Sequence, residues 1–183
     1  MKKIFYFLML ITLMTGCGCE SSKMLNTPTK RVEMFFANYQ TLDEDVLTQL
    51  NDVIDEDANM TDEQKEKYRD IMKKHYQNIT YDVKDETING DDATVTVEVE
   101  VTDYSKAMLE ADTYLEEHSE EFNDESGNYD KSKFYDYRLE QMKDVKDKVK
   151  YTLEITLTKI DDEWIMDDIT DIDEKKIHGV YNY

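Results

Sequence analysis

The sequence predicts an α+β fold, with N-terminal helices packed against a curved antiparallel sheet of about four strands. Three observations support this fold class. Apolar residues recur at helical spacing through most of residues 27–77, and they alternate strictly with polar residues in 95–101 and 151–157. A second helical stretch, 105–148, separates two predicted hairpins. Helices and strands that are segregated in this way are typical of α+β domains, and we expect residues 27–183 to form a single domain.

Each of the three N-terminal helices is expected to begin at a capping residue. Thr27 precedes Pro28, the pairing of an N-cap with proline at the first helical position. Asp43 can cap a second helix, and Thr61 forms a capping-box pattern with Gln64 at the start of a third. Their spacing directs the following residues inward: Val32, Phe35, Phe36, Tyr39, Val46, Leu47, Leu50, Val53, Ile54, Tyr68, Ile71, Met72 and His75.

Four strands are expected, joined as two hairpins. Asn89-Gly90 is a strong turn signal between the first two strands, and Asp161-Asp162 joins the strand at 151–157 to one at 164–169. The alternation places one apolar face inward and leaves the other in water. The inward residues are Ile79, Tyr81, Val83, Val95, Val97, Val99, Val101, Tyr151, Leu153, Ile155 and Leu157.

Two helices form an insert between the hairpins, and a short helix closes the chain. Either Asp103 or Ser105 starts the first insert helix, and Asp130 caps the second after a polar loop at 123–129. The short helix at 173–178 ends at Gly179. The insert directs these residues inward: Met108, Ala111, Leu115, Phe122, Phe134, Tyr137, Met142 and Val145.

Residues 1–16 have the pattern of a cleavable signal peptide. Two lysines precede an apolar stretch at 4–14, which is shorter than the roughly 20 residues that a spanning helix needs. The sequence Met14-Thr15-Gly16-Cys17 then resembles the lipobox of bacterial lipoproteins, although Leu is more usual than Met at its first position. The resemblance implies a lipid on the Cys17 thiol and a tether at 17–26. Cys19 is a weaker candidate acceptor, and an ordinary secretory signal is the simpler alternative.

Composition excludes several functional classes. The chain has 22 basic and 43 acidic residues, and its net charge of −21 disfavours binding to nucleic acid. Residues 1–16 contain two lysines and no acid, so the rest of the chain carries −23. Both cysteines lie near the signal, which leaves residues 20–183 without a disulfide, a zinc–thiolate site or a cysteine nucleophile.

No motif for catalysis or for cofactor binding stands out. The three histidines lack metalloprotease spacing, and the five glycines form no phosphate-binding loop. We interpret His75 as a buried, hydrogen-bonded residue, His118 as part of a solvated acidic face, and His178 as part of the tail. Trp164 and the tyrosines are interpreted as packing residues, with Tyr135 and Tyr137 as the first to test for a ligand groove. We therefore predict no catalytic residue, metal ligand or cofactor.

One segment has the ligand spacing of a calcium-binding EF-hand loop. Met60 stands where that loop needs glycine, and Asp62 where it usually has an apolar residue. An acidic helix end followed by a capping box explains the same pattern more simply, and we predict no calcium site. The six oxygen-bearing residues at the ligand positions are Asp55, Asp57, Asn59, Thr61, Glu63 and Glu66.

Three stretches resemble a group of small lipoproteins of Gram-positive bacteria that are mostly uncharacterised: 88–97 (INGDDATVTV), 151–159 (YTLEITLTK) and 163–168 (EWIMDD). The order of elements also resembles the cone-shaped nuclear-transport-factor-two-like fold, over residues 27–169. The resemblance implies a cone that binds small ligands in some relatives and catalyses reactions in a few. The insert at 105–148 departs from the minimal fold, and an inward Asp–His pair typical of the enzymes is not evident.

Two functions follow as expectations. The first is a non-enzymatic binding module, anchored on the extracytoplasmic face of the cell membrane, whose partner is an envelope protein, a peptide or a small ligand. The second is an enzyme that uses the cone pocket. We favour the first because no catalytic constellation is visible. A filled cone would support binding, and a pocket lined by Asp or His beside Tyr would support an enzyme.

Overall fold

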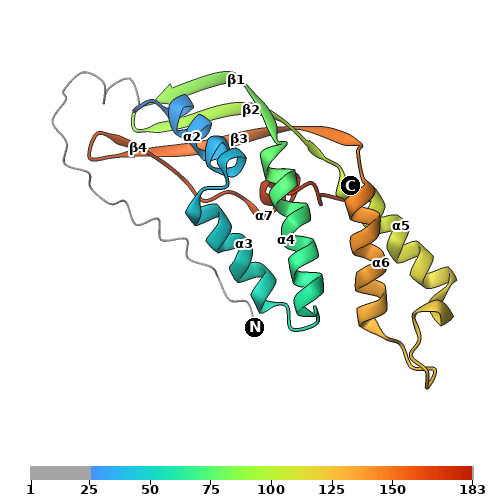
Figure 1. Ribbon diagram of the computed structural model, residues 1–183. Helices are drawn as coiled ribbons and strands as arrows, with labels where there is room; N and C mark the ends of the chain where they lie inside the picture. The colour runs from blue at the N-terminus through green and yellow to red at the C-terminus, as the bar shows by residue number, and fades with distance from the viewer. Residues whose placement is uncertain (1–25, 183) are drawn as a thin grey trace.

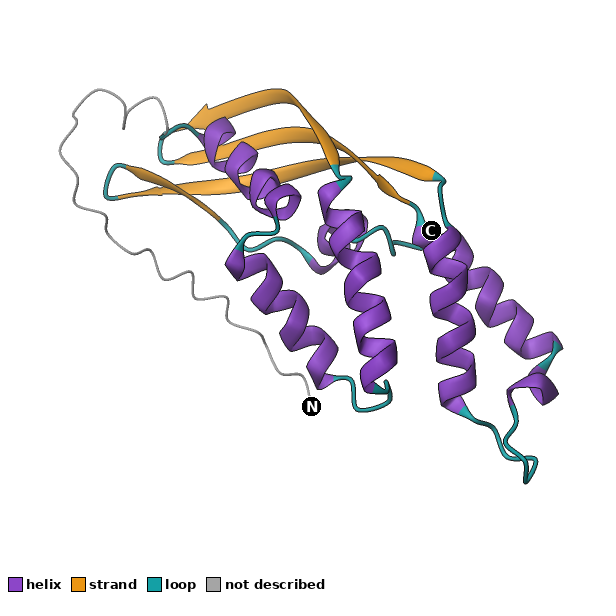
Figure 2. Ribbon diagram, viewed as in Figure 1, coloured by secondary structure: helices purple, strands orange, loops and turns teal. Residues whose placement is uncertain are grey.

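The computed structural model describes residues 26–182, so the predicted signal peptide, Cys17 and nearly all of the predicted tether lie outside the described residues. It confirms the α+β class, with helices gathered on one side of a curved antiparallel sheet of order β1-β2-β3-β4 (Figures 1 and 2). The strands are β1 (Thr80–Asn89), β2 (Asp92–Thr102), β3 (Lys148–Ile160) and β4 (Glu163–Met166). The helices are α2 (Pro28–Thr41), α3 (Glu44–Glu56), α4 (Asp62–Gln77), α5 (Tyr104–Glu117), the 3₁₀ helix η1 (Ser119–Phe122), α6 (Lys131–Asp144) and α7 (Asp171–Ile177). Within the described part, no helix is both long and apolar enough to cross a membrane.

The predicted helix caps are confirmed. The Thr27 hydroxyl accepts a hydrogen bond from the Lys30 amide, and Asp43 caps α3. Thr61 and Gln64 exchange both bonds of the capping box at the start of α4. These local bonds satisfy helix N–H groups that otherwise lack intrahelical partners, which is why sequence alone located them.

The inner face of the sheet is apolar and filled. Val95, Val97, Val99 and Val101 on β2 are fully buried, as are their inward neighbours on β3. Helix α2 packs across this face, and Phe36 on α2 stacks on Tyr81 with ring centroids 4.9 Å apart. The other face of the sheet is polar and carries charge pairs such as that between Lys150 and Glu98. The predicted alternation of both strands is thereby confirmed.

A β-bulge in β1 links the edge strand to α2. The register shifts between Val83 and Asp85, and Glu86 is brought opposite the buried Val95. The Glu86 carboxylate then accepts hydrogen bonds from the amide (2.9 Å) and the hydroxyl (2.7 Å) of Thr29, in the first turn of α2. A carboxylate at this place satisfies a free N–H group and interacts favourably with the helix dipole.

Five predicted details needed correction or were settled by packing. Val53 was expected inside but is 65% exposed, because α3 packs chiefly on α4 and its other side faces solvent. The last strand ends at Met166, three residues before its predicted end at 169. The short helix begins at Asp171, two residues before its predicted start, and Thr170 is its N-cap. Phe122 lies in η1 and not in α5, whose cap is Asp103 and not Ser105.

The α5–α6 insert has a small core of its own. Ala111, Phe122 and Phe134 are buried together and form a cluster separate from the main core. The insert extends from one end of the sheet, and α6 lies beside α4 (Figure 1). The Gln64 amide fixes this arrangement by donating to the carbonyl (2.8 Å) and the hydroxyl (2.9 Å) of Ser132. The insert therefore forms an arm against α4 instead of covering the inner face of the sheet.

Candidate functional site

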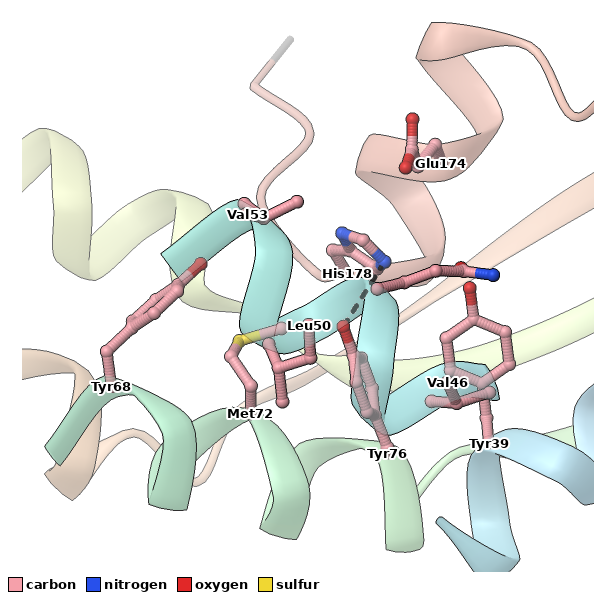
Figure 3. A pocket seen from close by; sticks show the side chains of 10 residues that line it. Tyr39, Val46, Leu50, Val53, Tyr68, Met72, Tyr76, Glu174 and His178 are labelled. Carbon is pink, nitrogen blue, oxygen red and sulfur yellow. Dashed lines mark hydrogen bonds between the residues drawn. The ribbon is translucent and has the colours of Figure 1, made fainter. Parts of the chain in front are cut away.

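A small cavity lies where α2, α3, α4 and α7 meet (Figure 3). Its volume is about 60 Å³. Since a buried water needs roughly 10–15 Å³ of such space, the cavity has room for about four small heavy atoms. The apolar part of its wall is formed by Val46, Leu50, Val53 and Met72, and the polar part by Tyr39, Gln49, Tyr68, Tyr76, Glu174 and His178.

The last turns of α2 and α4 bring two tyrosines together at this cavity. The rings of Tyr39 and Tyr76 meet edge to face, with centroids 4.9 Å apart. Both hydroxyls point toward α7, where His178 and Glu174 lie (Figure 3). The Tyr76 hydroxyl is 3.5 Å from His178 Nε2, at the limit of a hydrogen bond. The cavity therefore gathers hydroxyl, imidazole and carboxylate groups over an apolar floor.

Helix α7 is held in place by contacts from α4 and from the start of α5. Ile177 is 1% exposed, and its carbonyl accepts a hydrogen bond from His75 Nε2 at 2.8 Å. Because a carbonyl can only accept, Nε2 must carry the proton. The Tyr104 amide donates to the Gly179 carbonyl at 2.8 Å. These contacts hold the end of α7 in place, and Glu174 and His178 border the cavity from this helix.

Burial keeps the imidazoles and phenols of this region neutral. Desolvation lowers the pKa of both His75 and His178 from 6.5 to about 4. Desolvation, followed by the charge of Glu174, raises the pKa of Tyr39 to about 12, and desolvation also raises the pKa of Tyr76. At neutral pH these tyrosine and histidine side chains are therefore uncharged hydrogen-bonding groups.

The structure shows the surroundings of each of the three histidines. His75 is buried and hydrogen-bonded, as predicted. His118 lies on the acidic surface, 3.6 Å from Glu121, and its ring stacks on Tyr114. His178 does belong to the C-terminal tail, but the tail packs inward and makes this residue part of the cavity wall. Its position in sequence gave no sign of this.

The aromatic residues singled out in the sequence lie elsewhere. Trp164 is 7% exposed and belongs to the main core, which confirms its interpretation as a packing residue. Tyr137 stacks on Tyr114 in the insert, with centroids 4.9 Å apart. The Tyr135 hydroxyl donates to Asp57 at 3.2 Å and joins α6 to the end of α3. Neither insert tyrosine lines the cavity.

Sequence reasoning missed most of the polar cavity wall. Tyr76 follows His75 directly but was not predicted to face inward, and Gln49 and Glu174 look like ordinary surface residues in the sequence. Tyr39 and Tyr68 were expected to face inward, but nothing in their spacing connected them with the C-terminal tail. Helical periodicity identifies a buried face without identifying what packs on it.

No protein-family model, curated protein or solved structure matches the chain.

The residues with EF-hand spacing are directed to other partners. Asp57 accepts hydrogen bonds from the backbone and side chain of Asn59, both at 2.8 Å, which lower its pKa. Glu63 pairs with Lys67, and Glu66 pairs with Arg69. In the described part of the chain, no three His, Cys, Asp or Glu residues come together as a metal-binding group. The segment acts as a helix end and a capping box.

We expect calcium at millimolar concentration to give no stoichiometric binding at residues 55–66, because these carboxylates already have partners: Asp55 and Glu66 pair with Arg69, Glu63 pairs with Lys67, and Asp57 accepts from Asn59. Isothermal titration calorimetry of the protein and of Asp57→Ala measures this directly. Saturable one-to-one binding that Asp57→Ala abolishes would contradict the prediction.

Stability is expected to fall as the pH decreases from about 6.5 to 4, because His75 is buried as the neutral form. The pKa of the folded state is below the unfolded value of 6.5, so the unfolded chain binds the proton more readily in this window. The full effect is on the order of 3 kcal/mol by pH 4 and is absent above pH 7. Urea midpoints at pH 7.5 and 5 measure it. A His75→Gln variant should show a weaker pH dependence than His118→Gln, and equal dependences would contradict the assignment.

Proposed function

We propose that the chain is a lipoprotein anchored through Cys17 to the extracytoplasmic face of the cell membrane, where its folded part acts as a non-enzymatic binding module. The lipobox-like sequence at 14–17 supports the anchor. Lipid chains bind by burying methylenes at about 0.8 kcal/mol each, and two or more chains hold a protein stably. The net charge of −21 argues against nucleic acid as a partner.

The filled inner face of the sheet is the observation that favours a binding function over a catalytic one. Val95, Val97 and Val99 are each 0% exposed, and Leu153 is 1% exposed, beneath the helices. An enzyme that used a cone pocket needs its reactive groups inside that cone. Here the polar groups instead gather at the junction of four helices, in a space suited to a small group of a ligand or partner.

Cys17→Ala is expected to abolish lipid attachment and to leave the protein either unprocessed or released from the membrane. Metabolic labelling with a radioactive fatty acid, followed by fractionation, measures both consequences. Cys19→Ala is the matched control and should be labelled and retained like the wild type. Retention of a correctly cleaved Cys17→Ala protein at wild-type levels would overturn the anchor.

A further inference from the structure

The charge of the cavity indicates the kind of ligand that it can hold. Glu174 is a carboxylate, and the ten lining residues include no lysine or arginine. An anion would meet the Glu174 charge without a compensating cation, whereas a cation gains from it. The net charge of −21 also raises the local concentration of cations around the protein.

The aromatic wall fits a cation in a second way. Tyr39 and Tyr76 meet edge to face, and the His178 ring lies 5.6 Å from Tyr76 and 6.4 Å from Tyr39 between centroids. Phenol oxygens and neutral imidazole nitrogens accept hydrogen bonds from ammonium N–H groups, and the hydroxyls of Tyr39 and Tyr76 point toward α7 (Figure 3). His178 is neutral above pH 5 because burial lowers its pKa to about 4.

The size of the cavity limits the ligand to a small headgroup. A volume of about 60 Å³ accommodates roughly four water-sized atoms, and a trimethylammonium group has four heavy atoms. The rest of a longer ligand must leave past the rim. Val53 lines the cavity and is 65% exposed, which places the rim on the solvent side of α3.

We propose that the cavity between α2, α3, α4 and α7 binds the ammonium headgroup of a small organic cation, held by Glu174 and the aromatic wall of Tyr39, Tyr76 and His178. This assignment rests on the proposed binding function and gives it a ligand class. The backbone of α7 is positioned in advance, because His75 and Tyr104 donate hydrogen bonds to the carbonyls of Ile177 and Gly179. Binding therefore requires little movement of this helix.

The test is a ligand-observed NMR titration of the full chain in a maltoside detergent at pH 7.5. The probes are choline, n-butylammonium and 3,3-dimethylbutan-1-ol, the uncharged carbon analogue of choline. We expect at least one cation to bind saturably, with a dissociation constant on the order of millimolar, and the alcohol to bind about tenfold more weakly. Binding of choline alone indicates a quaternary headgroup, and binding of butylammonium alone indicates a primary amine.

Two variants locate the site. Glu174→Gln should weaken cation binding about two- to fivefold, because Glu174 is exposed, whereas Glu154→Gln, an equal charge change on the polar outer face of β3, should leave it unchanged. Val53→Trp should block the cavity from its exposed rim without altering the core. Circular dichroism verifies that each variant is folded.

Absence of saturable binding by both cations, equal binding of the alcohol, or unchanged binding in either Glu174→Gln or Val53→Trp would overturn the cation site. None of these outcomes bears on the anchor, which Cys17→Ala tests separately. A wild-type protein that does not fractionate with membranes but binds choline would instead overturn the anchor and keep the site.

Discussion

Val97→Asp is expected to unfold the protein or to cost it several kcal/mol of stability. Val97 is 0% exposed in β2, between Val83 on β1 and Leu153 on β3. An aspartate there places a carboxylate among apolar side chains with no cation to pair with it, and such burial costs several kcal/mol. The loss of the cooperative transition in thermal circular dichroism measures the effect.

Glu98→Lys is the neighbouring control on the opposite face of the sheet. Glu98 lies 2.9 Å from the Lys150 amine and 3.6 Å from that of Lys84, so a lysine here replaces two attractions with repulsions. Exposed pairs contribute about 0.2–1 kcal/mol each, and we therefore expect a moderate loss and an intact fold. Glu98→Gln should cost less than Glu98→Lys. Equal melting temperatures for Val97→Asp and Glu98→Lys would show that the strand register is wrong.

Gly179→Ala is expected to cost about 3 kcal/mol or more, because backbone conformation and steric contact both oppose it. Gly179 has a φ of +69°, in the left-handed region. A Cβ atom at this position would lie 2.0 Å from the Thr102 carbonyl oxygen and 3.1 Å from the His75 ring. The Thr102 oxygen is backbone, so the clash is relieved only if the tail moves away. The urea midpoint measures the loss of stability.

Gly127→Ala is the matched control, since Gly127 has a similar φ of +82° but nothing within 4 Å of an added Cβ. Its cost should be limited to the conformational penalty of about 1–2 kcal/mol. The difference in stability between the two variants measures the contribution of the close packing of the tail beneath β2. Gly179→Ala should also weaken cation binding, because it displaces the helix that carries Glu174. Equal urea midpoints for the two variants would contradict this close packing.

Much of the fold could be predicted because its signals are local. The Thr27, Asp43 and Thr61 caps each involve hydrogen bonds that span two or three residues, so the sequence pattern and the structural feature coincide. Residue alternation in β2 and β3 likewise identified their buried faces. Val53 shows the limit of this reasoning, because helical spacing could not tell that only one side of α3 would be covered.

The candidate site could not be predicted, because it depends on contacts between distant segments. His75 and Ile177 are 102 residues apart, and so are Tyr76 and His178. The Glu86 cap on Thr29 depends on a bulge that shifts the register of β1, which the alternation did not reveal.

The sequence by itself determined the element types, the starts of α2, α3 and α4 and the buried faces of β2 and β3, and it raised the lipid-anchor hypothesis at Cys17, because these depend on short spacings and on composition. Only the tertiary structure decided that the tail packs against α4, that the inner face of the sheet is filled and that the polar cavity lies among four helices. The physical reason is that periodicity specifies which face of an element avoids water. The partner of that face is set by how all the elements pack together.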